Sequence, residues 1–301
     1  MLYTFASDPF YSDFVRQPRN TDPHSAYIFD NPKFHPFFEN AIGAMDGTHF
    51  ISSGSAEEQA LARDQKGLIT WNCLAACDFD HNFTYLSTGW EGTVSDSTMY
   101  FDSHTTDLKV HPGKYYLADA GFPLANELLT PYRGVQYHLA EWGCVDLRCV
   151  IFYYKYFYNV YSYPFSPKTP QELFNLRHAS ARNIVERIFG ILKNRFAILQ
   201  HNPGLTPKVQ AHLPAALAAL HNVICKYDPK EIEDHIRELD VAEHNVDELD
   251  LETGLQRGSE GELATGPPKQ AEKKGVEKRR DEMANCMWIQ YQQILQERGE
   301  I

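Results

Sequence analysis

The sequence predicts an α/β protein in which a mixed β-sheet is flanked by helices. Two observations support this: β-rich runs and one helix precede a long amphipathic helix, and 43% of the 301 residues are hydrophobic, which suits a sizeable core. A third observation concerns the division of the chain: the proportion of acidic residues rises sharply near residue 228. We therefore expect four segments: a lead-in at 1–39, a main domain at 40–227, a disordered acidic linker at 228–269 and a C-terminal helix at 270–301.

The charge of the chain is distributed unevenly. The formal charge is −12, but residues 228–301 hold 19 acidic against 10 basic side chains, so −9 belongs to this tail and only −3 to the rest. An acidic protein surface repels polyanions. Because the acidity is mostly a property of the tail, a nucleic-acid ligand for the main domain is not excluded.

The first β-rich run, Asn40–His49, is expected to be a short buried strand that ends in Asp46. Gly47 follows and would let the backbone come close to whatever the carboxylate binds. His49 has two interpretations: it orients Asp46 or contacts a phosphate, or it is an ordinary core or turn histidine.

Two further β-rich runs, 68–78 and 83–90, predict a meander with the first strand, because a turn-like connection joins them. A helix follows, and Asp96 is interpreted as its N-cap in preference to a direct chemical role. The pattern of an apolar run that ends in a lone carboxylate then recurs in Lys114–Phe122, where the carboxylate is Asp119.

A long helix is predicted from about Ser180. Its apolar side chains recur at helical spacing and form one core-facing stripe: Ile184, Val185, Ile188, Ile191, Leu192, Phe196 and Leu199. Glu186 lies off this stripe in a basic surround, although a single glutamate on a helix is usually only solvated. A second, Ala-rich helix is expected at 206–227, where Pro214 would kink it or mark its first turn.

Three carboxylates therefore stand on two strand ends and one helix: Asp46, Asp119 and Glu186. Carboxylates held on rigid elements suit Mg²⁺, which needs only a few protein ligands beside water and phosphate. A pair of such ions can activate a water and stabilise the leaving oxygen in phosphodiester cleavage. The alternative, in which each carboxylate is a solvated or capping side chain, stays open on these residues alone.

Three segments closely resemble, in order, the three blocks of the PIF/Harbinger-type DDE transposases and their domesticated nuclease relatives: Ile42–His49, Lys114–Gly134 and Phe174–Leu199. In that family, metal is bound by the aspartate of Asp-Gly-Thr-His, the aspartate of Asp-Ala-Gly and the glutamate of the Arg-Asn-x-x-Glu-Arg helix. Carried over by position, the resemblance implies a catalytic, metal-binding triad of Asp46, Asp119 and Glu186.

The resemblance runs from about Phe10 to Asp228 and resumes weakly at Arg279–Arg298. It implies a ribonuclease H-like fold and hydrolysis of DNA by a water activated between two Mg²⁺ or Mn²⁺ ions, with strand transfer as an optional later step. It also implies a nuclear location. The DNA contacts it suggests are His49, Arg133, Arg177, Arg182, Arg187 and Lys193, with Arg133 equally interpretable as a partner for a nearby carboxylate.

Family members carry a helical DNA-binding region before the first block, and the 45 residues before Asp46 show no counterpart of it. We therefore expect a separate DNA-binding partner protein to supply recognition of a specific DNA end.

The chain departs from the family pattern in a Tyr-rich run at 144–163, where charged residues argue against a membrane span. We hypothesise that this run is a retained intron, because its composition differs abruptly from both flanks. Sequencing the transcript tests this, and a spliced message that still encodes the run would refute it. The alternative is an exposed edge strand or hairpin, prone to aggregation.

Two other function classes compete with a nuclease. A domesticated or inactive relative would act as a nuclear DNA- or protein-binding module, and a hydrolase of a small phosphorylated substrate would use similar metal chemistry. The basic strip beside Glu186 favours a polyanion over a small substrate. The six cysteines show neither zinc-site spacing nor a disulfide framework, and no secretory signal opens the chain, so an intracellular, reducing location is expected.

Overall fold

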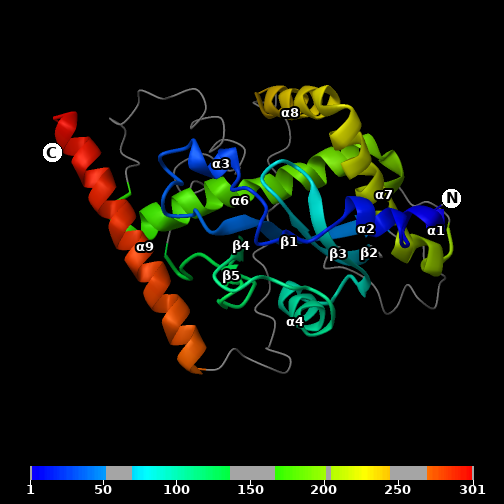
Figure 1. The fold of residues 1–301 in the computed structure, drawn as a ribbon, viewed down its shortest axis with the longest axis horizontal. Helices are drawn as coiled ribbons and strands as arrows, with labels where there is room; N and C mark the ends of the chain where they lie inside the picture. The colour runs from blue at the N-terminus through cyan, green and yellow to red at the C-terminus, as the bar shows by residue number, and fades with distance from the viewer. Residues whose placement is uncertain (1, 52–69, 136–166, 201–204, 245–269, 300–301) are drawn as a thin grey trace.

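The computed structural model describes residues 2–51, 70–135, 167–200, 205–244 and 270–299. Over these ranges the chain forms one five-stranded sheet with helices around it, so the predicted α/β class is confirmed (Figure 1). Within them, no helix is both long and apolar enough to cross a lipid bilayer. The Tyr-rich run at 144–163 falls outside the described residues, and so does the hypothesis of a retained intron.

The sheet has the strand order β3-β2-β1-β4-β5. Its strands are β1 (Ala41–Ile51), β2 (Thr70–Cys77), β3 (Phe83–Glu91), β4 (Tyr115–Leu117) and β5 (Leu128–Leu129). The first three form the predicted antiparallel meander, whereas β4 pairs parallel with β1, and β5 parallel with β4. Asp78 closes the turn between β2 and β3, because its Oδ1 accepts hydrogen bonds from the backbone N–H groups of Asp80 and Asn82.

The first strand is longer than predicted, and Asp46 lies in its middle rather than at its end. The reason is the partner strand, since pairing with β2 runs from Ala44 to Ile51 and keeps β1 extended beyond Asp46. Asp119, in contrast, lies just past the end of β4, as the sequence predicted.

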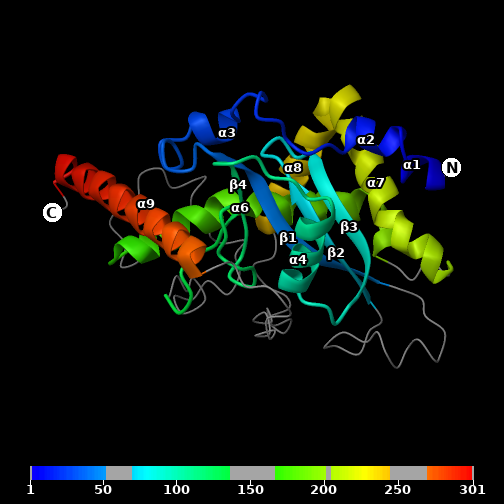
Figure 2. The ribbon, with the colours of Figure 1, turned by 60° about the horizontal axis from the view of Figure 1, so that its bottom comes forward.

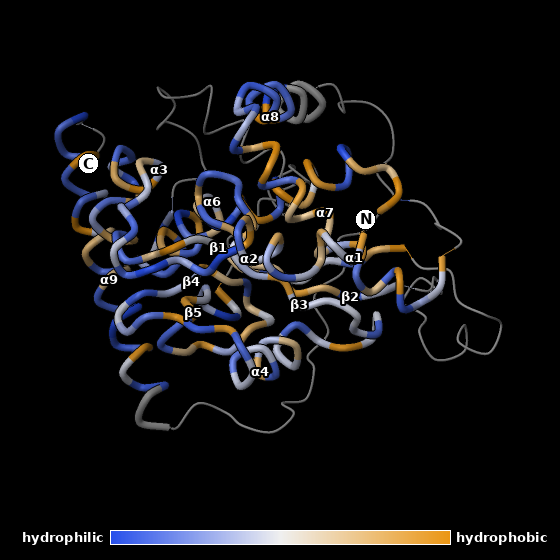
Figure 3. The backbone as a smooth tube through the Cα atoms, turned by 45° about the vertical axis from the view of Figure 1, so that its right-hand side comes forward, coloured by the Kyte–Doolittle hydropathy of each residue, from blue (hydrophilic) through white to orange (hydrophobic). Residues whose placement is uncertain are grey.

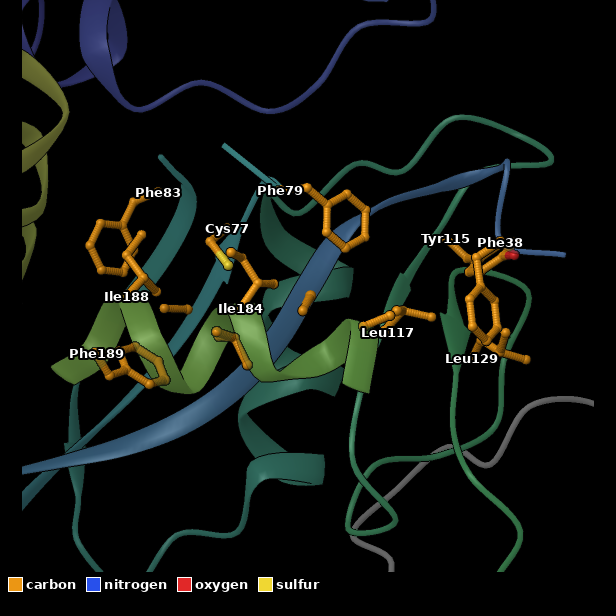
Figure 4. Close-up of a cluster of buried hydrophobic side chains, with 14 of the residues drawn as sticks. Phe38, Cys77, Phe79, Phe83, Tyr115, Leu117, Leu129, Ile184, Ile188 and Phe189 are labelled. Carbon is orange, nitrogen blue, oxygen red and sulfur yellow. The ribbon is translucent and has the colours of Figure 1, made fainter. Parts of the chain in front are cut away.

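Helices cover both faces of the sheet. α6 (Pro170–Arg195) and α7 (Pro207–Tyr227) lie on one face and α4 (Asp96–Thr106) on the other (Figure 2). The part of the predicted stripe that lies in α6 is buried, and Ile184 and Ile188 point toward the sheet (Figure 4). A second cluster, which includes Met45 and Tyr100, fills the space beneath α4.

The carboxylate-bearing helix begins ten residues before the predicted start at Ser180. Its first turn is built for initiation: Thr169 is the N-cap and its side chain accepts from the Glu172 N–H, while Pro170 occupies the first helical position. The helix therefore spans 26 residues, and Glu186 lies in its middle part rather than in its first two turns.

The acidic linker predicted at 228–269 is partly wrong, because its first part is a helix, α8 (Pro229–His244); residues 245–269 lie outside the described ranges. Its tube is mostly hydrophilic in Figure 3, with one buried apolar anchor, Ile232. Arg195 of α6 also pairs with Glu231. A sparse apolar pattern was thus enough for a docked helix.

The remaining helices are short or terminal. They are α1 (Leu2–Phe5), α2 (Phe10–Phe14), α3 (Ala26–Phe29), the 3-10 turn η3 (Ala197–Leu199) and the predicted C-terminal helix, α9 (Gln270–Glu297). Figure 1 shows α9 crossing the start of α6 and passing β5.

Candidate active site

Two of the three predicted carboxylates meet at one guanidinium. Arg182 donates from Nη1 to Asp46 Oδ2 at 2.8 Å and from Nη2 to Glu186 Oε1 at 2.5 Å. Asp46 comes from the middle of β1, and the two other residues stand one turn apart on α6. The second carboxylate oxygen of Glu186 is held too, because the Asn183 amide, oriented to satisfy its neighbours, donates to Oε2 at 3.1 Å.

The third carboxylate is placed by the sheet. β1 and β4 are parallel with Ala44 opposite Leu117, so Asp46 and Asp119 each follow that pair by two residues. The Asp119 side chain turns back on its own loop, where Oδ1 accepts from the Gly121 N–H at 2.8 Å. Its negative charge acts on the titration of both Asp46 and Arg182, so the three predicted residues form one electrostatic cluster.

A fourth carboxylate, Asp96, joins this cluster. The N-cap of α4 is Ser95, whose hydroxyl accepts from the Thr98 N–H, so the N-cap interpretation of Asp96 was wrong. The Asp96 carboxylate instead lies against β1: a Cβ on Gly47 would stand 2.0 Å from its Oδ1. A side chain at position 47 would therefore displace the Asp96 carboxylate. The approach of Asp96 to β1 could not be predicted from the sequence, because it depends on how α4 packs under the sheet.

Burial and mutual repulsion perturb the cluster's titration. Burial raises the pKa of Asp46 to about 7 although the Arg182 guanidinium opposes the shift, and the charges of Asp119, Asp96 and Glu186 add to the rise. Burial, together with Asp119, raises the pKa of Asp96 to about 6. Burial acts to lower the pKa of Arg182, but Asp46 and Glu186 outweigh it and hold the guanidinium charged.

The donor types of this cluster suit a hard divalent cation, because all four are carboxylates. Within the described ranges, however, no three His, Cys, Asp or Glu side chains are arranged as ready metal ligands. The guanidinium of Arg182 stands between Asp46 and Glu186 and pairs with both, so its single positive charge offsets one of their two negative charges. The residues thus fit a metal in kind, and a metal there would have to compete with Arg182 for these two carboxylates.

Two of the predicted DNA contacts have other roles. Arg177 is only 6% exposed, donates to Gln290 at 2.9 Å and lies over the Phe37 ring. Arg182 bridges the carboxylates, and its side chain is 12% exposed. Both guanidiniums therefore have partners inside the protein, and their role as phosphate contacts stays a prediction. The sequence showed that they were basic but could not show which way α6 turns them.

The other predicted contacts lie nearer the surface. Lys193 stands two turns beyond Glu186 and donates to Thr48 Oγ1 at 2.9 Å. Arg133 Nη2 donates to the Phe122 carbonyl at 3.4 Å, so it contacts a carbonyl of the Asp119 loop rather than a carboxylate.

The last two predicted contacts, His49 and Arg187, have neighbours other than the three carboxylates. His49 is exposed and alternates in β1 with Asp46, so it lies on the opposite face, with Nδ1 3.2 Å from Thr70 Oγ1. Arg187 Nε donates to the Asn183 amide oxygen at 3.2 Å. His49 thus does not orient Asp46, and its role toward a phosphate stays a prediction.

Comparison with known proteins agrees with these motifs. A family model described as DDE superfamily endonuclease matches residues 45–222. The chain is 24% identical over 189 residues to Putative nuclease HARBI1 of Homo sapiens, and equally to that of Bos taurus, covering 60% of this chain and 45% of each relative. It is 25% identical over 217 residues to Protein ALP1-like of Arabidopsis thaliana, covering 65% and 45%.

The chain thus spans less than half the length of each of these relatives. No solved structure matches it. The matched family segment begins one residue before Asp46 and contains Asp119 and Glu186. The Harbinger-type resemblance stated from the sequence is thereby confirmed.

Proposed function

Because the chain belongs to the DDE superfamily endonuclease family, we propose that it is a divalent-metal-dependent nuclease that hydrolyses DNA phosphodiester bonds with Asp46, Asp119 and Glu186. The observation that carries the proposal is convergence. A strand, a strand end and a helix, which are far apart in sequence, bring three carboxylates to one cluster around Arg182. The family implies a nucleic-acid substrate.

The topology supports a ribonuclease H-like assignment of the fold. In the sheet order β3-β2-β1-β4-β5, the strands β3, β2 and β1 are antiparallel neighbours. On the other side of β1, β4 and β5 run parallel to it. Parallel neighbours present their carboxyl ends at the same edge. This order sets Asp119 beside the carboxylate on the central strand, and α6 supplies the glutamate from the covering layer.

Each residue of the cluster would have a distinct role in holding the metal. Asp46, Asp119 and Glu186 would hold Mg²⁺ or Mn²⁺, which when bound supplies an activated water and charge stabilisation at the phosphate. Ligation requires deprotonated carboxylates, and a bound metal would compete with Arg182 for Asp46 and Glu186. Asp96, against Gly47, would fix the backbone of β1 beside Asp46.

The substrate would lie along the side of α6 that carries Glu186 and Lys193. Lys193 is partly buried at the end of this side and would exchange its hydrogen bond to Thr48 for a phosphate, and Arg133 is exposed beside the Asp119 loop. Cations flanking an acidic centre attract the DNA backbone and leave the scissile phosphate to the metal. A nuclear location, a separate DNA-binding partner and strand transfer after cleavage belong to the same proposal.

The test is cleavage of supercoiled plasmid by the full chain with Mg²⁺, with Mn²⁺ and with EDTA. We expect cleavage that requires metal and is abolished by Asp119→Asn, which removes charge but little volume. Asp102→Asn is the matched control, because Asp102 is exposed on α4 and outside the cluster. A folded wild type that binds DNA equally with and without metal and never cleaves it would instead establish the binding module.

A further inference from the structure

The C-terminal helix α9 lies outside the family-matched residues 45–222 but is part of the same core. Its buried side chains are Val276, Ala284, Met287 and Tyr291. The last three belong to the cluster that also contains Phe174 of α6 and Leu129 of β5. The helix is therefore docked by apolar burial, and the direction of its polar side chains is fixed.

One arginine of α9 binds the chain just after β5. Arg280 Nη1 donates to the carbonyls of Thr130 and Pro131, each at 3.1 Å, and the guanidinium lies 4.0 Å from the centroid of the Tyr132 ring. Hydrogen bonds from a charged donor, combined with a cation–π contact, are among the stronger local interactions.

Neighbouring residues of α9 bind the same segment. Tyr132 donates its hydroxyl to Asp281 Oδ1 at 2.7 Å. Arg279 Nη2 donates to the Asn126 carbonyl at 3.3 Å, and its guanidinium lies 4.8 Å from the Tyr115 ring centroid in β4. Three successive residues of α9 thus contact the chain just before and just after the two-residue strand β5, and the first residue of β4.

This segment is hydrogen-bonded directly to the residue before Asp119. The Ala118 N–H donates to the Leu129 carbonyl at 3.1 Å, and the Tyr116 N–H donates to the Glu127 carbonyl at 2.9 Å. β4 has three residues and β5 has two, so few backbone bonds hold this corner in place. The contacts from α9 add to them at the point where Asp119 leaves the sheet.

We propose that Arg280 is a positioning residue: through Thr130, Pro131 and β5 it holds the backbone of Ala118 and Asp119 in the place that metal binding needs. The inference rests on the proposed function for its catalytic consequence. It gives α9, beyond the matched family segment, a role in the geometry of the site.

The test uses the full chain and the substitution Arg280→Met, which keeps much of the side-chain length but removes the donors. Lys278→Met is the matched control, because Lys278 lies on the same helix, is 78% exposed and pairs only at 3.8 Å with Glu282. Amide hydrogen exchange of Ala118 should become faster by at least about tenfold in Arg280→Met, because charged hydrogen bonds are lost. Lys278→Met should leave it unchanged.

A positioning role also predicts a split in the kinetics. In Arg280→Met the Mn²⁺ concentration for half-maximal binding, measured by calorimetry with Mn²⁺ alone, should rise severalfold. kcat should fall and KM for DNA should not change. Arg280→Lys keeps a charged donor and should restore part of the Mn²⁺ affinity and part of kcat. If Arg280→Met releases α9 altogether, Arg280→Gln provides the milder test, since it keeps a neutral amide donor on a polar side chain and removes the charge.

The outcomes separate the two proposals. Unchanged Ala118 exchange in a folded Arg280→Met variant overturns the positioning role, whatever the nuclease activity is. Faster exchange with unchanged Mn²⁺ binding and kcat also overturns it, because the contact would then only stabilise the fold. A wild type that binds no Mn²⁺ and cleaves no DNA contradicts the proposed function, while the exchange experiment still decides whether α9 holds this corner.

Discussion

The two halves of the candidate site are built differently. Asp46 and Glu186 stand on an 11-residue central strand and a 26-residue helix, both anchored in the main core. Asp119 follows a three-residue strand whose neighbour, β5, has only two residues and is held from outside by α9. The first half is rigid because of the core, whereas the second depends on polar contacts from a distant part of the chain.

The comparison predicts which interaction controls the stability of each half: charge in one and hydrogen bonding in the other. In the half built by β1 and α6, charge should dominate, because a single guanidinium pairs with two partly buried carboxylates. In the half built by β4 and β5, the loss of even a few hydrogen bonds from α9 should speed up amide exchange, because few backbone hydrogen bonds hold these strands. The following predictions begin with the largest effect.

Arg182→Met should destabilise the metal-free protein by about 3 kcal/mol near neutral pH, because it leaves the buried carboxylate of Asp46 and the partly exposed one of Glu186 without their partner. Urea unfolding in EDTA measures the loss. Protonation of Asp46 should relieve much of it at pH 5, since the pKa of Asp46 is already about 7 with Arg182 present. An equal loss at pH 5 and pH 8 would contradict the electrostatic account of this half.

Gly47→Ala should cost about 1–3 kcal/mol, because the added Cβ would stand 2.0 Å from Asp96 Oδ1. Gly275→Ala is the matched control: nothing lies within 4 Å of its Cβ in α9, so it should be neutral or stabilising. The double variant Gly47→Ala with Asp96→Ala should recover part of the loss. Failure to recover any of it would show that Asp96 is not what Gly47 accommodates.

Asp46 and Asp96 should each make folding less favourable as the pH rises. Their pKa values rise on folding, to about 7 and about 6, so between pH 4 and 7 these two groups bind more protons in the folded state than in the unfolded state. Each lowers the free energy of unfolding by at most about 1.4 kcal/mol per pH unit. Burial lowers the pKa values of His81, His178 and His221 to about 4, 3 and 3, and these side chains act in the opposite direction over the same range. The contribution of Asp46 is therefore the difference between the wild type and Asp46→Asn in EDTA: the wild type should lose stability relative to the variant as the pH rises, and parallel curves would contradict this.

Much of the site could be predicted from the sequence, because its three carboxylates lie in short motifs. Asp119 was placed correctly at a strand end, and the apolar stripe of α6 indicated the buried face. The extension of β1 past Asp46 could not be predicted, since it depends on pairing with β2. The approach of Asp96 to Gly47 likewise depends on the packing of α4 under the sheet.

Other errors have equally local causes. The helix α8 was missed because its high charge resembles that of a linker, although Ile232 and the Arg195–Glu231 pair anchor it. Arg177 is basic and lies in the family motif, but its place on α6 turns it toward Gln290 of α9. Composition indicates that a residue is charged, whereas only the fold decides whether that charge faces DNA or another part of the protein.

The central claim, that this cluster is a metal site whose charge Arg182 now balances, is tested most directly by thermal unfolding with and without Mn²⁺. The wild type should be stabilised by about 2.7 kcal/mol at 100 times the dissociation constant, through mass action. Asp102→Asn should show the same rise in Tm, and Asp119→Asn should show none. An equal rise in all three proteins, or no rise in a folded wild type, would contradict the account.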